Sequence, residues 1–224
     1  MGVISVEQTD RLFWLGRYTE RVYTTMRLYF EAYDETIDKE EQEYIHFCER
    51  MEIPNIYENS LDFGRRYPFD ASNPDSIISN LNRAYDNAIV LREAIGTDTL
   101  SYIQLAIYDM QKAEVSETPV IAFQEVQDNI LAFWGICDDM IEDENTRNII
   151  KIGKRVERID LFGRLHAKKS DMVREYHRLA GRIGRTKLHY NQAVLDKIGE
   201  LLEADEDKID YWEIVNQIEG ILNV

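Results

Sequence analysis

The sequence is poor in the residues that mark several classes of protein. It has 4 prolines and 2 cysteines in 224 residues, which excludes a collagen-like chain and a disulfide framework. No apolar run approaches the ~20 residues of a membrane span, and the N-terminus has neither the basic nor the apolar region of a signal peptide. We therefore expect a cytoplasmic protein without a membrane-spanning segment.

Basic residues are scarce relative to acidic ones. The chain has 26 Lys and Arg against 42 Asp and Glu, so its formal charge is −16. This charge repels phosphates, and it disfavours both a general nucleic-acid binder and adsorption to an anionic membrane. The sequence also lacks the motifs of a nucleotide-phosphate loop and of a nucleophile elbow. We predict no nucleic-acid partner, no membrane partner and no cofactor.

Metal and thiol chemistry have little support in the sequence. Glu43 and His46 have the i, i+3 spacing of a di-iron site, but such a site needs a second Glu-x-x-His motif and further helix carboxylates. The sequence has no second motif of this kind. We therefore predict no metal site, and we expect Cys48 and Cys137 to be buried, reduced thiols.

The few prolines lie between periodic segments, which favours long helices. A capping-box pattern begins at Ser5, and Asn73-Pro74 and Thr118-Pro119 are typical of helix starts. Residues 54–74 form one long irregular stretch, and such connections are often functional. We expect helices at about 5–33, 38–53, 74–95, 99–112, 119–141, 145–168, 170–186, 190–203 and 207–222. The predicted fold is an all-α bundle of antiparallel neighbours, formed as a single domain over residues 1–224.

The most informative feature is an internal repeat. Residues 12–28 (LFWLGRYTERVYTTMRL) align without gaps to residues 149–165 (IIKIGKRVERIDLFGRL), 137 residues later. The two copies share a G-[RK]-x-x-E-R-x(5)-R-L string of charges, which a common amphipathic pattern does not explain. The charged members are Arg17, Glu20, Arg21, Arg27, Lys154, Glu157, Arg158 and Arg164.

Each copy places a strip of charge on a helix that is otherwise apolar almost all round, as expected for two pseudo-symmetric central helices. A glycine beside each strip would remove side-chain bulk. We expect the two copies to pack antiparallel about a pseudo-twofold axis. In that arrangement Glu20 would face Arg164, and Glu157 would face Arg27.

The charged strips allow two interpretations. In the first, the residues form a buried network that fixes the register of the helices. In the second, their cations form a pocket for a carboxylate, a phosphate or a peptide terminus, because Arg binds such oxygens bidentately. Arg21 and Arg158 are the arginines expected to face outward.

The string LFWLGRYTERV, its counterpart IGKRVERID and the segment FDASNPDSIISNLNRAYDNAIVLRE resemble the alpha-E family. This is a bacterial family of helical domains with a Glu-Arg motif, also catalogued as a domain of unknown function. The resemblance covers about residues 5–166, and residues 167–224 carry no assigned motif. The sequence departs from the family pattern at two positions. Lys154 stands where the first copy has Arg17, and Asp86 lies inside the middle motif.

The resemblance implies an accessory role. Members of the family tend to be encoded beside an ATP-grasp ligase and a transglutaminase-like peptidase, in a context of making or trimming a peptide-like product. We therefore expect a non-catalytic partner of such a ligase. The alternatives are an enzyme that uses Glu20 and Glu157 for acid–base chemistry on a small carboxylated or phosphorylated substrate, and a homo-oligomer.

A basic cluster follows the second copy of the repeat and gives the acidic chain a charge asymmetry. Its members are Lys168, Lys169, Arg174, Arg178, Arg182, Arg185 and Lys187. We interpret this cluster as a solvated helix face, with docking to an acidic partner or to the acidic C-terminal helices as the alternative.

Overall fold

A computed structural model describes residues 4–38, 43–116 and 119–222. Within these residues the regular elements are helices, with one isolated β-bridge between Tyr190 and Leu222, so the all-α prediction is confirmed. No helix in these ranges combines the length and the apolarity needed to cross a membrane. The chain gathers into two compact units, Met1–Glu20 with Glu142–Val224, and Arg21–Ile141. We describe each unit by itself, and a single domain over residues 1–224 stays a prediction.

Helix α1 (Val6–Asp38) contributes its first part to one unit and its remainder to the other. It begins where the capping box places it, because the Ser5 hydroxyl accepts a hydrogen bond from the Gln8 amide at 3.1 Å. In the first unit α1 is followed by α8 (Glu144–Arg164), α9 (Lys169–Ile183), α10 (Gln192–Glu203), the 3-10 helix Glu206–Lys208 and α11 (Tyr211–Ile218).

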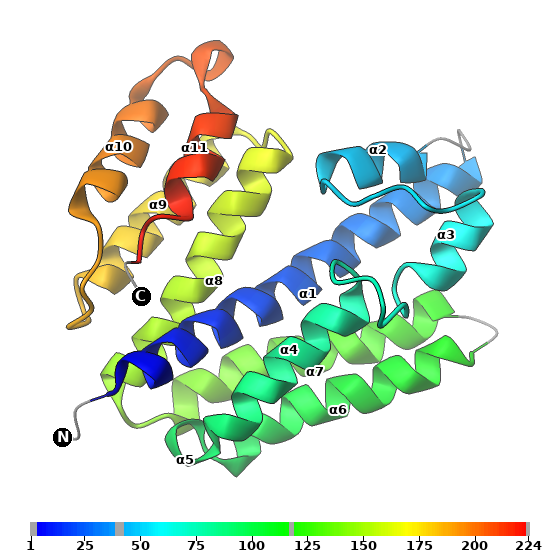
Figure 1. Cartoon of the computed structure of the whole chain (residues 1–224), viewed down its shortest axis with the longest axis horizontal. Coiled ribbons are helices and arrows are strands. Elements are labelled where there is room, and N and C mark those ends of the chain that lie inside the picture. Colours follow the sequence, from blue (N-terminus) through cyan, green and yellow to red (C-terminus); the bar gives the residue numbers. More distant parts are fainter. Residues whose placement is uncertain (1–3, 39–42, 117–118, 223–224) are drawn as a thin grey trace. The chain divides into compact units, whose positions relative to one another are not determined.

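The first unit is organised around α8, which packs against both α9 and α11 (Figure 1). Helix α10 completes the group by packing against α9 and α11. Helix α8 begins at an aspartate cap, since the Asp143 carboxylate accepts a hydrogen bond from the Thr146 amide at 2.7 Å. Its apolar residues Ile149, Ile152 and Val156 are fully buried, as the helical periodicity requires.

The second unit consists of the rest of α1 with α2 (Glu43–Arg50), α3 (Ser60–Arg66), α4 (Ile77–Val90), α5 (Arg92–Ile95), α6 (Thr97–Glu114) and α7 (Pro119–Met140). Helices α6 and α7 pack along each other, and α4 lies beside α6 (Figure 1). Helix α7 begins at Pro119, as predicted, while Thr118 lies outside the described residues.

The stretch 54–74 is more ordered than the sequence indicates. It contains α3, which begins at an Asn59 cap, and it buries Phe63 and Tyr67 against Tyr29 of α1. The Tyr29 hydroxyl donates to the Gly64 carbonyl at 2.9 Å. Burial raises the pKa of Tyr67 well above its usual value. The stretch therefore closes an aromatic core, and nothing in its geometry indicates the functional loop that its length suggested.

The helix start predicted at Asn73 is wrong by three residues. The Asn73 side chain accepts from the Asp75 amide at 2.9 Å and forms a turn, whereas Ser76 caps α4 by accepting from the Ser79 amide at 3.1 Å. Both residues are good caps, and the sequence pattern could not tell a polar turn from the helix start that follows it.

Candidate functional site

The two copies of the repeat lie on α1 and α8, and within the first unit they cross in direct backbone contact. A Cβ atom built on Gly16 would lie 1.9 Å from the Ile150 carbonyl oxygen, and one built on Gly153 would lie 2.1 Å from the Phe13 carbonyl oxygen. Only glycine fits at such a distance. The glycine beside each charged strip therefore has the packing role that the sequence predicts.

Glu20 lies at the centre of this crossing and is 0% exposed. Its Oε1 atom accepts a hydrogen bond from Arg158 Nε, and its Oε2 atom lies 3.6 Å from Lys154 Nζ. Burial lowers the pKa of Lys154 to about 8, against the raising effect of the Glu20 carboxylate. Removal from water here outweighs the attraction of the ion pair.

Glu157 occupies the corresponding position on α8 and is also 0% exposed. Arg17 Nε donates to its Oε2 atom at 2.7 Å, and Arg17 Nη2 lies 3.4 Å from Asp160 Oδ2. The Arg17 guanidinium also lies 4.9 Å from the ring centroid of Trp14, in cation–π geometry. The pairs Arg17–Glu157 and Lys154–Glu20 are equivalent under the 137-residue offset of the repeat.

The antiparallel arrangement is wrong, because residue numbers rise together along the two helices. Phe13 of α1 approaches Gly153 of α8, and four residues further along both helices Arg17 contacts Glu157. In the same way Gly16 approaches Ile150, and four residues further along both helices Glu20 contacts Lys154. The helices thus run parallel where they cross. Figure 1 shows both rising from the same end of the first unit. The wider expectation of a pseudo-symmetric bundle stays a prediction.

The parallel direction also corrects the expected ion pairs. Arg164 lies ten residues beyond Lys154, roughly 15 Å further along α8 than the position that Glu20 contacts. It pairs instead with Asp160 of its own helix at 3.0 Å. In the second unit Arg27 is 59% exposed and lies 3.9 Å from Glu31, again on its own helix.

The two arginines expected to face outward do not behave alike. Arg158 binds the buried Glu20 carboxylate, so the expectation is wrong for this residue. Arg21 belongs to the second unit and is half-buried. The structure therefore joins Arg17, Glu20, Lys154, Glu157 and Arg158 in one crossing, which we call the Glu–Arg network. Arg27 lies outside it, and Arg164 is linked to it through Asp160, which also lies 3.4 Å from Arg17.

Sequence reasoning missed a further buried carboxylate, Glu175 of α9, which is 1% exposed. It binds Arg155 and Arg178 at 2.7 Å each and lies 3.7 Å from Arg158 and 3.8 Å from Arg174. Although burial opposes its ionisation, these arginines hold the pKa of Glu175 below its usual value. The sequence signal that could have revealed this site is an acidic residue within a run of arginines on one predicted helix.

Arg182, further along α9, donates to the side-chain oxygen of Asn148 at 2.9 Å, so its hydrogen-bond partner on α8 is neutral. Burial and the nearby Arg185, Arg155 and Arg147 lower the pKa of Arg182. The cluster predicted as a solvated basic face is thus in part a contact surface between α8 and α9. Arg174 and Arg178 remain about half exposed.

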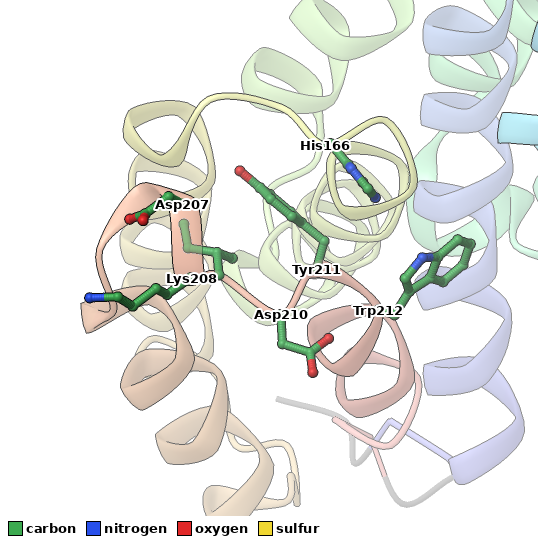
Figure 2. Close-up of a pocket in the computed structure, with 7 residues that line it drawn as sticks. His166, Asp207, Lys208, Asp210, Tyr211 and Trp212 are labelled. Carbon is green, nitrogen blue, oxygen red and sulfur yellow. The ribbon is translucent and has the colours of Figure 1, made fainter.

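A shallow hollow of 340 Å³ lies elsewhere in the first unit, where the turn after α8 meets the start of α11. Figure 2 shows its aromatic side chains together at one end, with Asp207 and Lys208 extending from the other. The rings of His166 and Tyr211 stack with centroids 4.9 Å apart. The lining includes His166, Asp207, Lys208, Asp210, Tyr211 and Trp212. Aromatic faces beside carboxylates suit a basic group.

The remaining candidates carry no site geometry within the described residues. Glu43 Oε1 lies 3.6 Å from His46 Nδ1, and no group of three or more His, Cys, Asp or Glu in those residues could hold a metal ion. Cys48 and Cys137 are buried, as predicted, and neither forms a disulfide within the described residues. Burial raises the pKa of Cys48 to about 11, so its thiol is a poor nucleophile near neutral pH.

The model of the Alpha-E family, described as a predicted alpha-helical domain with a conserved ER motif, matches residues 8–201. The chain belongs to the Alpha-E family. In the two copies of the repeat the Glu-Arg pair is Glu20-Arg21 and Glu157-Arg158. The match extends beyond the expected limit near residue 166 and includes α9 and α10, so most of the segment without a recognised motif is part of the Alpha-E domain. Comparisons with curated proteins and with solved structures gave no match.

Proposed function

We propose that this Alpha-E chain is a non-catalytic binding protein and that its Glu–Arg network is a structural clamp. The observation that carries the proposal is the burial of both motif glutamates, which are 0% exposed and bound by cations of the facing helix. A substrate cannot reach a carboxylate enclosed in this way. The interpretation as a buried network therefore has more support than the open cationic pocket.

The clamp works through close approach. The glycines let the α1 and α8 backbones touch, and the charged side chains beside them span the short gap between the helices. Such pairs add little net stability over an apolar contact, but removing one partner leaves a buried charge and typically costs ~3–5 kcal/mol. A network of this kind fixes which faces of the two helices meet.

The proposed partner is an ATP-grasp ligase or its peptide-like substrate, as the resemblance of the sequence to its family implies. Charge segregation supports a protein partner of some kind. Residues 144–187 hold 13 of the 26 Lys and Arg but 5 of the 42 Asp and Glu, a local charge of +8 in a chain of −16. The two buried thiols, which form no disulfide within the described residues, are consistent with the proposed cytoplasmic location.

One observation favours the alternative of an enzyme. With a pKa of about 8, Lys154 would be partly neutral near physiological pH and could accept a proton. Its side chain, however, is 13% exposed and lies against Glu20, which leaves little room for a substrate. We therefore assign Lys154 to the clamp.

The test is direct binding of the purified full chain to an ATP-grasp ligase of the proposed kind and to its peptide-like substrate, measured by biolayer interferometry. We expect saturable binding. The absence of binding to either molecule at concentrations up to about 1 mM, the weak end of specific association, would overturn the proposal.

The control variant for this experiment is Arg27→Ala, because Arg27 is exposed and outside the Glu–Arg network. It should leave both stability and ligase binding unchanged. Arg158→Ala is unsuitable as a test of the binding surface, since it removes a ligand of the buried Glu20 and would report unfolding.

A further inference from the structure

The basic residues of α8 and α9 form one surface that its own carboxylates do not neutralise. We name it the basic face and define it by Arg147, Arg155, Arg174, Arg178, Arg182 and Arg185. At its centre a single carboxylate, Glu175, is the shared partner of four arginines, two of them at 2.7 Å. Arg174 also pairs with Asp171 at 2.7 Å and Arg158 with Glu20, so three carboxylates meet four arginines and the centre of the face keeps a net positive charge.

The far end of the basic face is also rich in cations. Arg182 hydrogen-bonds to the neutral amide of Asn148, and the charged groups around it are Arg147, Arg155 and Arg185 with one carboxylate, Glu144. The Nε atom of Arg155 is buried and makes no hydrogen bond within the described residues. Cations held close together despite their mutual repulsion are typical of a surface that binds an anionic ligand.

The face is open to a ligand of helical shape. Arg174, Arg178 and Arg182 follow one another at i, i+4 spacing, so their Cα atoms lie roughly 6 Å apart along α9. Gly181 lies between the last two, and a Cβ built there would meet nothing within 4 Å. The arginines thus form a row on a surface that a partner can approach closely.

We propose that the basic face binds an acidic segment of a partner protein, with Asp or Glu side chains at one-turn spacing against the arginine row. Planar guanidinium groups bind carboxylates bidentately, and one turn of an acidic helix repeats at the same roughly 6 Å. A long polyanion is a poorer fit, because beyond one Debye length of the face it meets the rest of a chain whose total charge is −16.

The inference deepens the proposed function, since it names the chemistry of the surface that a partner contacts. It can fail independently, because its test needs no ligase. The probe is a short fluorescein-labelled poly-L-glutamate, no longer than the arginine row, titrated with the full chain and followed by fluorescence anisotropy at two salt concentrations. Long-chain inorganic polyphosphate is the competing probe.

We expect saturable binding of poly-L-glutamate that weakens as salt rises, and weaker binding of polyphosphate. The double variant Arg182→Gln/Arg185→Gln should weaken the binding about tenfold, because it removes two cations while glutamine can still donate to Asn148. The matched control, Lys197→Gln/Lys208→Gln, removes two exposed cations from another part of the same unit and should change binding less than twofold.

Circular dichroism verifies that both double variants are folded. If the Arg182→Gln/Arg185→Gln variant is unfolded, the single variant Arg185→Gln replaces it, since Arg185 is exposed and its side chain can change without breaking the Asn148 contact. If the control is unfolded, the single variant Lys197→Gln replaces it. Equal weakening by the two double variants, no binding of poly-L-glutamate, or tighter binding of polyphosphate would each overturn the proposal.

Discussion

Replacing Gly16 by alanine tests the backbone contact between α1 and α8. In an ordinary helix the exchange stabilises by roughly 0.5–1 kcal/mol, because alanine has the higher helix propensity. Here the new Cβ would lie 1.9 Å from the Ile150 carbonyl oxygen and 2.9 Å from its carbon, and both are backbone atoms that no rotamer change can move. The helices must separate, and overpacking of this kind costs about 1–3 kcal/mol or more.

A matched glycine in the same unit serves as the control for this change in unfolding free energy. Gly181 lies inside α9, and a Cβ built there meets nothing within 4 Å, so Gly181→Ala should show the propensity gain alone. We expect the two variants to differ in unfolding free energy by about 1–3 kcal/mol, the overpacking cost alone, because both gain the same helix propensity.

The assay is urea unfolding of the full chain followed by circular dichroism, with the wild type measured alongside. Gly153→Ala should resemble Gly16→Ala, since its Cβ would lie 2.1 Å from the Phe13 carbonyl oxygen. The double variant should cost less than the sum of the two single costs, because one separation of the helices relieves both overlaps. A Gly16→Ala variant as stable as Gly181→Ala would refute the contact.

Two further predictions concern the charges at the crossing. Glu20→Gln should destabilise the fold by ~3–5 kcal/mol in urea unfolding, because it leaves Arg158 and Lys154 without their anion, whereas a change within ~0.5 kcal/mol would contradict the buried network. Lys154 has a folded pKa of about 8, below the ordinary lysine pKa of 10.5, so the unfolded chain binds more protons between these two values and stability should rise with pH there. Lys154→Met should lose this rise, which unfolding curves at pH 8 and pH 10 would detect; an equal pH dependence in both proteins would count against the lowered pKa.

The sequence predicts the helices better than it predicts their directions. The cap at Ser5, the start of α7 at Pro119 and the close approach at Gly16 follow from local chemistry that the chain carries at those positions. The direction of α8 relative to α1 does not follow from local chemistry. Short loops make neighbouring helices antiparallel, but the whole second unit separates these two along the chain, so that rule does not apply to them.

The Glu175 centre shows a second limit of sequence reasoning. The spacing of the basic cluster places its arginines on a helix, but it does not say that α9 turns a carboxylate toward α8. Glu175 is stabilised by Arg155 and Arg158, which lie 20 and 17 residues earlier in the sequence and on another helix. Only the packing of α8 on α9 brings these charges together, and a helical wheel treats each helix alone.

The charges also explain why the crossing takes one direction. An antiparallel pair with Gly16 opposite Gly153 would keep the backbone contact, but it would place Glu20 opposite Ile149 and Glu157 opposite Leu12, counting residues in opposite senses from the glycines. Two carboxylates would then be buried without a cation, at a cost of several kcal/mol each. The parallel crossing gives both of them an arginine or lysine. The glycines thus set how closely the helices approach, and the paired charges select the direction in which they run.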